Sequence, residues 1–192
     1  MDVIDALRAG HPVLLPADGV YGLCALAGSP EAVRALYALK GRGDAQPTAI
    51  IAAGVETLVE AVPELPRPLL DTLLPGPYTL VLPNPSRRFS WLTGERPDTI
   101  GVRVARVPAA TQRVLDAVGL IAATSANEPG EPAAASLDAV PDRIRRGCAA
   151  ELDAGGLAGT PSTVVDFTGD EPRILREGAG AIDEALAAAR LR

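Results

Sequence analysis

The sequence predicts an α/β fold, with one twisted, open, mixed sheet flanked by helices and a cleft at the ends of its strands. Apolar runs of strand length alternate with helical stretches along the whole chain. No internal repeat or long linker interrupts this alternation, so residues 1–192 are predicted to form a single domain. Hydrophobic residues make up 47% of the chain and aromatic residues only 3%, which predicts a globular protein with an aliphatic core.

The predicted strands are short apolar runs bounded by glycine, proline or polar residues. They lie at residues 11–16, 47–53, 78–82, 99–104, 120–123, 162–167 and 173–176. In the run 99–104 the residues alternate, so Arg103 is expected on the face opposite Val102 and Val104. The glycine-containing stretch 17–23, directly after the first strand, is predicted to be a loop, which is where α/β folds bind ligands.

Capping residues and prolines delimit the predicted helices. Ser29 is a capping residue and Pro30 fits the first turn of the helix that follows. Gly41 is suited to end the same helix. The predicted helices lie at residues 2–10, 29–41, 55–62, 67–74, 108–118, 136–146 and 182–191.

The bulk composition excludes several classes of protein. The net charge of −6 argues against a protein that coats nucleic acid, since such proteins carry a basic excess. Cys24 and Cys148 do not make a disulfide framework. His11 is the only histidine and is expected to be structural, so we predict no metal site and no Ser-His-Asp triad. The acidic N-terminus and the lack of a membrane-spanning run lead us to expect a cytoplasmic protein.

Lys40 is the only lysine, and the other seventeen of the 18 basic residues are arginine. A point-charge ammonium is not interchangeable with a planar guanidinium, so a lone lysine in such a chain suggests a position where only an ammonium serves. Arg42 follows two residues later, and the pair predicts a phosphate-binding site. The same two residues also fit an alternative interpretation, as solvated cations that complement a helix C-terminus.

Polar residues recur at the ends of the predicted strands and helices. They are Lys40 and Arg42, Thr99 and Arg103, Ser125 and Asn127, and Ser162 and Arg176. In α/β folds such residues tend to converge on one site. Each pair alone also fits a turn or a solvated edge, so the hypothesis of one site depends on their combination. The common glycine-rich nucleotide motifs and the nucleophile elbow are absent from the sequence.

Several stretches together resemble one known family. They are residues 16–23, 40–42, 75–80, 91–94, 101–104, 124–127, 162–166 and 174–179. In this order and combination they resemble the YrdC/YciO family, whose best-known members are threonylcarbamoyl-AMP synthases. The Lys-x-Arg motif followed by the Ser-x-Asn motif is the most specific part of the resemblance. It implies a YrdC-like domain of the short, single-domain type.

The resemblance implies an enzyme, a nucleotidyltransferase that joins L-threonine, bicarbonate and ATP into L-threonylcarbamoyl-adenylate and releases pyrophosphate. A partner threonylcarbamoyl transferase complex would then modify an adenosine beside the tRNA anticodon, so contact with tRNA would be indirect or weak. Positioning and charge neutralisation suit this reaction, because a carbamate oxygen attacks the α-phosphate without an enzyme nucleophile. ATP is a substrate, and Mg²⁺ would be held mainly by its phosphates.

The resemblance also implies roles for individual residues. The catalytic residues would be Lys40, Arg42, Ser125 and Asn127. The residues that bind ATP would be Lys40, Arg42, Gln46, Thr99, Asn127 and Arg176. The residues that bind threonine would be Gly19, Tyr21, Arg103, Ser125 and Ser162. Arg103 would pair with the threonine carboxylate.

Ala17, Gly19 and Ile51 depart from the common pattern of the family near the expected amino-acid site, and they leave the choice of amino acid open. One alternative function is that of a YciO-like paralogue acting on a related adenylate or carbamoyl compound. Another is binding of double-stranded RNA or tRNA, against which the acidic net charge weighs. The basic residues that could still form local patches are Arg87, Arg88, Arg143, Arg145 and Arg146.

Overall fold

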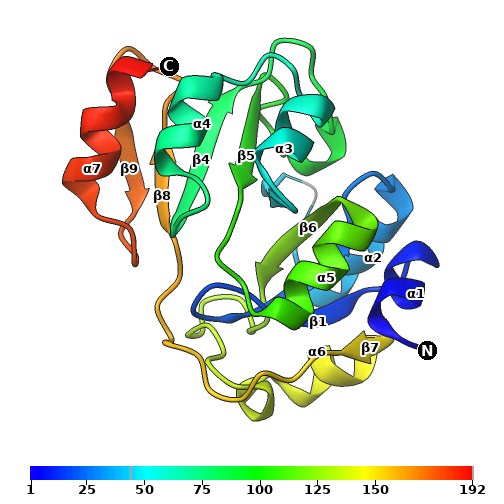
Figure 1. The fold of residues 1–192 in the computed structure, drawn as a ribbon. Coiled ribbons are helices and arrows are strands. Elements are labelled where there is room, and N and C mark those ends of the chain that lie inside the picture. Colours follow the sequence, from blue (N-terminus) through cyan, green and yellow to red (C-terminus); the bar gives the residue numbers. More distant parts are fainter. Residues whose placement is uncertain (44, 192) are drawn as a thin grey trace.

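The computed structural model describes residues 1–43 and 45–191, which form one nine-stranded sheet with helices packed against it (Figure 1). The strands are β1 (Val13–Pro16), β2 (Tyr21–Leu26), β3 (Ala49–Ala52), β4 (Tyr78–Pro83), β5 (Thr99–Arg103), β6 (Leu120–Ser125), β7 (Ala150–Glu151), β8 (Thr163–Asp166) and β9 (Arg173–Arg176). Their order is β7-β1-β2-β6-β3-β5-β4-β8-β9. Three neighbouring pairs, β1/β7, β3/β5 and β4/β8, are parallel and the others are antiparallel, so the predicted mixed sheet is confirmed.

The α-helices are α1 (Val3–Arg8), α2 (Pro30–Lys40), α3 (Val55–Ala61), α4 (Arg67–Leu73), α5 (Ala109–Val118), α6 (Asp142–Gly147) and α7 (Ile182–Ala187). Short 3₁₀ turns are η1 (Ser90–Leu92), η2 (Leu137–Ala139) and η3 (Ala188–Leu191). The predicted caps of α2 are confirmed: Ser29 Oγ accepts a hydrogen bond from Ala32 N at 3.1 Å, and Gly41 ends the helix at φ +69°. Over the described range, no helix is long and apolar enough to cross a membrane.

The prediction of a loop at 17–23 was wrong for its last three residues. Residues Tyr21–Leu26 form β2, which pairs with β1 on one side and β6 on the other. The glycine at position 22 suggested a loop, but a glycine in a central strand also permits close approach of other chains. Only the turn before β2 is irregular, and it is closed by a hydrogen bond from Ala17 N to Val20 O at 3.0 Å.

The predicted single helix at 136–146 is interrupted. Pro141 separates η2 from α6, because proline has no N–H to continue the helical hydrogen bonds. Strand β7 was not predicted, since its two residues are too few to produce a pattern. The closing helix begins as predicted at Ile182 but ends in the 3₁₀ turn η3.

The two faces of the sheet are covered differently (Figure 1). Helices α1 and α5 pack on one face through Leu7 and Leu115, against residues that include Val13 of β1 and Ile121 of β6. The opposite face packs against helices α2 and α4, in a cluster that includes Leu80 of β4. Each fully buried leucine contributes about 1.5–3 kcal/mol through removal from water. Coverage by α1 and α5 stops before β4, so part of their face stays open there.

Candidate functional site

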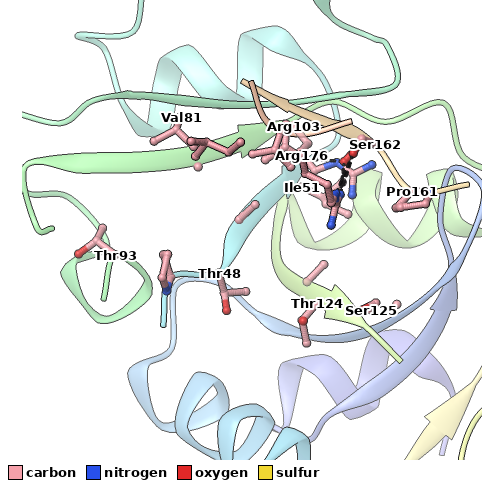
Figure 2. A pocket seen from close by; sticks show the side chains of 18 of the residues that line it. Thr48, Ile51, Val81, Thr93, Arg103, Thr124, Ser125, Pro161, Ser162 and Arg176 are labelled. Carbon is pink, nitrogen blue, oxygen red and sulfur yellow. Dashed lines mark hydrogen bonds between the residues drawn. The ribbon is translucent and has the colours of Figure 1, made fainter. Parts of the chain in front are cut away.

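A cavity of about 460 Å³ lies on this uncovered part of the sheet (Figure 2). Strand geometry determines which residues reach it, because alternate side chains share a face. Thr99, Gly101 and Arg103 of β5 line the cavity, whereas Ile100 and Val102 point into the core. The polar residues at the strand ends therefore border the cavity, and the middle of the strands forms its floor.

Six of the sequence-predicted site residues line this one cavity, although they come from distant parts of the chain. They are Arg42, Thr99, Arg103, Ser125, Ser162 and Arg176. Figure 2 shows Arg103, Arg176 and Ser162 together at one end, with Thr48 and Thr93 toward the other. The predicted convergence of polar residues is thus observed for these six.

Lys40 lies outside that group. Its side chain is only 4% exposed, and its Nζ donates hydrogen bonds to Ser125 O, Asn127 O and Asn127 Oδ1 at 2.7, 2.5 and 2.7 Å. Burial, followed by the nearby charge of Arg42, lowers the pKa of Lys40 to about 8. This ammonium therefore holds the Ser125–Asn127 segment, and its contact with phosphates stays a prediction.

Arg42 faces the cavity and also supports its wall. Its Nη1 donates hydrogen bonds to Pro47 O and Thr48 Oγ1, both at 3.1 Å. Burial lowers the pKa of Arg42, although a guanidinium remains charged at neutral pH. Arg42 is accordingly a fixed positive charge in the wall of the cavity, to which phosphate oxygens could bind.

Arg176 and Ser162 form a hydrogen-bonded unit at the other end of the cavity (Figure 2). Arg176 Nη2 donates to Ser162 O at 2.7 Å and to Ser162 Oγ at 3.2 Å. The Ser162 hydroxyl is in turn 2.8 Å from Thr79 Oγ1. Burial lowers the pKa of Arg176, and the positive charge of Arg103 lowers it further. The two guanidinium groups thus share one electrostatic environment.

Arg103 makes an ion pair that the sequence did not predict. Its Nη2 donates to Asp18 Oδ1, and the side chains are only 14% and 13% exposed. Asp18 Oδ2 and Arg103 Nε are buried without a hydrogen-bond partner among the described residues. Asp18 belongs to a stretch that the sequence analysis singled out, but nothing in its spacing pointed to a partner 85 residues away.

Four further predicted residues do not line the cavity. Tyr21 neighbours Gly22, which lines it, so alternation turns Tyr21 to the opposite face, where its hydroxyl bonds Asp153 Oδ1 at 2.9 Å. Gly19 supports the adjacent turn at φ +90°, where a side chain would collide with the backbone of residue 160. Gln46 is exposed. Asn127 is 9% exposed and is bonded to Lys40.

Several lining residues were missed by the sequence analysis. Thr79 precedes a core leucine in β4, and the alternation of that strand could have identified it. Arg96 lines the cavity too, and its Nη2 donates to Thr168 Oγ1 at 2.9 Å. No sequence signal pointed to Arg96, because its loop has no periodicity. The described residues contain no cluster of three or more histidine, cysteine or acidic side chains that could hold a metal ion.

The basic residues that could have formed an RNA-binding patch are largely paired with acids. The ion pairs are Arg88–Glu64, Arg143–Glu128, Arg145–Glu151 and Arg146–Asp142. Such pairing reduces the positive potential that a phosphate backbone would encounter.

Comparison with known proteins gives consistent matches over most of the chain. A family model described as "Telomere recombination", for the Sua5/YciO/YrdC family, matches residues 5–178. A Mycobacterium tuberculosis protein is 34% identical over 182 residues, which is 93% of this chain and 83% of that protein. A Pyrococcus abyssi protein named threonylcarbamoyl-AMP synthase is also 34% identical over 182 residues, but the chain covers only 53% of its length.

Solved structures match the fold. One structure of P. abyssi Sua5 has a TM-score of 0.85 at 32% identity and covers 94% of this chain and 56% of that chain. Another, described as complexed with L-threonine, has a TM-score of 0.79 at 32% identity and covers 96% and 55%. E. coli YciO has a TM-score of 0.82 at 26% identity and covers 95% and 90%. The chain thus spans little more than half of Sua5. On the family model and the sequence identity together, the chain belongs to the Sua5/YciO/YrdC family.

Proposed function

We propose that this protein is a threonylcarbamoyl-AMP synthase. It would combine L-threonine, bicarbonate and ATP into L-threonylcarbamoyl-adenylate, pyrophosphate and water, as a step toward threonylcarbamoyladenosine in tRNA. The observation that carries the proposal is the single cavity onto which Arg42, Ser125, Arg103, Ser162 and Arg176 converge. Relatives of this chain are named for that activity, and a structural relative is described with L-threonine.

The proposed reaction has two bond-forming steps. The amine nitrogen of threonine attacks the carbon of bicarbonate, and water leaves, which gives a carbamate. A carbamate oxygen then attacks the α-phosphorus of ATP, and pyrophosphate leaves. Neither step needs a nucleophile from the protein, so the protein's contribution is to align the reactants and offset negative charge.

The charges in the cavity suit these reactants. ATP, bicarbonate and the threonine carboxylate are all anionic, and Arg42, Arg103 and Arg176 are positive and face the same cavity. In the proposal Arg42 and Ser125 meet the phosphates, Thr99 and Arg176 contact ATP, and Arg103 and Ser162 meet threonine. Any Mg²⁺ would be held largely by ATP phosphates.

The predicted residues that do not line the cavity act indirectly in this proposal. Lys40 positions the Ser125–Asn127 segment through its three hydrogen bonds. Tyr21 and Gly19 shape the amino-acid end by fixing the strand and turn beside it. Asn127, which is bonded to Lys40, would reach ATP only after a local rearrangement. Gln46 is exposed between two residues that line the cavity, Ala45 and Pro47.

A YciO-like substrate change is the second candidate function. Ala17 and Ile51, which depart from the common family pattern, both line the cavity. The departures therefore lie where a substrate would be contacted, and they would alter the fit to an amino-acid side chain. Under either function we propose a cytoplasmic enzyme that binds tRNA weakly, since its basic clusters are ion-paired. As a threonylcarbamoyl-AMP synthase it would hand its product to a separate transferase.

A pyrophosphate-release assay across a panel of amino acids tests the proposal. Release should require ATP, bicarbonate and an amino acid together, with L-threonine the best. Omission of bicarbonate is the matched control, because simple amino-acid activation does not need it. Equal turnover with glycine, or none with any amino acid, would favour the YciO-like function. Submicromolar binding of duplex RNA in a gel-shift titration would instead support an RNA-binding protein.

A further inference from the structure

Asp18 carries a carboxylate that has no role in the proposed reaction. It lies beside the amino-acid end of the cavity, which is the end that contains Arg103 and Ser162. It lies in the turn between β1 and β2, whose residues Ala17 and Val20 line the cavity. The turn is held in place, because Gly159 N donates to Gly19 O at 2.7 Å. Asp18 is therefore held in place directly behind the cavity-lining residue Arg103.

The partner of Asp18 is the guanidinium proposed to bind the substrate carboxylate. Arg103 Nη2 donates to Asp18 Oδ1, and both side chains are about seven-eighths buried, at 14% and 13% exposure. The contact leaves Asp18 Oδ2 and Arg103 Nε without partners. A guanidinium has five N–H donors, so Arg103 can hold Asp18 and still meet a second carboxylate.

The charges at this end add up to a small positive value. Arg103 and Arg176, the second of which is also proposed to contact ATP, lie at the same end. Asp18 offsets one of their two charges, which leaves +1 for the bound substrates. A substrate with one carboxylate would balance this charge. A second carboxylate on the substrate would lie unpaired near Asp18, in a largely buried space where like charges repel strongly.

We propose that Asp18 is the specificity-determining residue that limits this end of the cavity to amino acids with a single carboxylate. It positions Arg103 and holds the local charge at +1. Neutral amino acids, threonine among them, are accepted, and aspartate and glutamate are rejected. This inference rests on the proposed function and names its substrate class.

The test compares the binding of L-threonine and L-aspartate by calorimetry, in the presence of a non-hydrolysable ATP analogue with Mg²⁺. The wild-type protein should bind threonine at least about tenfold more tightly than aspartate. Asp18→Asn keeps the shape of the side chain and removes its charge, so it should lower this ratio about tenfold or more. Asp18→Glu keeps the charge and should preserve the ratio. Asp183→Asn, at an exposed position near the start of α7, is the matched control for loss of one charge and should also preserve it.

An unchanged ratio in Asp18→Asn, or an equal loss of selectivity in Asp18→Glu, would overturn the inference. If Asp18→Asn fails to fold, the binding of L-asparagine and L-aspartate to the wild-type protein tests the inference instead, because these two ligands differ by one charge and have nearly the same shape. The wild-type protein should bind asparagine more tightly than aspartate. Equal or weaker binding of asparagine would overturn the inference. A wild-type protein that binds the ATP analogue but no neutral amino acid would instead contradict the proposed function itself.

Discussion

Two cations of this protein, Lys40 and Arg103, are both largely buried beside the same cavity, yet they are used differently. Lys40 Nζ donates to three protein oxygens and does not line the cavity. Arg103 lines the cavity and donates one hydrogen bond to the described residues, to Asp18. A cation satisfied by protein oxygens stabilises a segment, whereas one with spare donors can bind a ligand. The rarity of a residue type in the sequence does not distinguish these two uses.

Replacement of Lys40 by alanine should have the largest effect. Three oxygen atoms would lose their donor, and the Ser125–Asn127 segment would lose its anchor. We expect the free energy of unfolding to fall by about 2–3 kcal/mol and, because the site segment would be misplaced, kcat to fall about a hundredfold or more. Urea denaturation and pyrophosphate release measure the two quantities.

Lys40→Arg is the matched variant for charge. It should restore part of the stability, because a guanidinium can donate to the same oxygens but needs more space. If Lys40→Ala lowers kcat while the unfolding free energy stays unchanged, the ammonium acts on the substrate and does not anchor the Ser125–Asn127 segment.

Arg103→Ala should have the next largest effect, and of a different kind. Loss of the proposed carboxylate partner should raise KM for threonine about thirtyfold or more and leave KM for ATP nearly unchanged. Steady-state kinetics with each substrate varied in turn measures this split. A variant that loses ATP affinity while threonine affinity persists would place Arg103 in the nucleotide part of the cavity.

These two residues also show what the sequence could and could not predict. The strand predicted at 99–104 is observed at Thr99–Arg103, and the predicted position of Arg103 on the face opposite Val102 is confirmed. The end of α2 at Lys40 followed from Gly41. The direction of the Lys40 side chain did not follow, because its partners lie 85 and 87 residues away. Local patterns predict elements and faces, but contacts between distant segments depend on the packing of the whole chain.

The orientation of Tyr21 also depends on distant segments of the chain. Reading 17–23 as a loop left the orientation of Tyr21 open, and only the pairing of β2 with β1 and β6 turns it away from the cavity. Its neighbour Gly22 reaches the cavity instead. The register of a strand is fixed by its partners, which a single stretch of sequence does not contain.

Tyr21→Phe should therefore have a smaller effect, on stability alone. The hydroxyl bonds Asp153 Oδ1 and Gly155 O and accepts from Ala154 N, at 2.9 to 3.0 Å. Its loss should cost about 1 kcal/mol of unfolding free energy, because these partners lie at the surface and can bind water instead. Thermal denaturation measures this cost. A tenfold rise in KM for threonine at unchanged stability would show that Tyr21 contacts the substrate after all.

An equally small expected effect is a pH dependence of stability that comes from Lys40. Its pKa is lowered to about 8 in the folded protein, whereas a lysine in an unfolded chain titrates near 10.4. Between these values the unfolded chain holds a proton that the folded protein has released, so this group makes the folded state more stable as pH rises. From pH 8 to pH 9 the gain is about 1 kcal/mol. Burial raises the pKa values of the Cys24 and Cys148 thiols, which act in the opposite direction. The quantity to measure is therefore the difference between the wild-type protein and Lys40→Met in urea denaturation at the two pH values. A difference that stays constant would mean that Lys40 keeps its proton through this range, and that its three oxygen partners offset the cost of its burial completely.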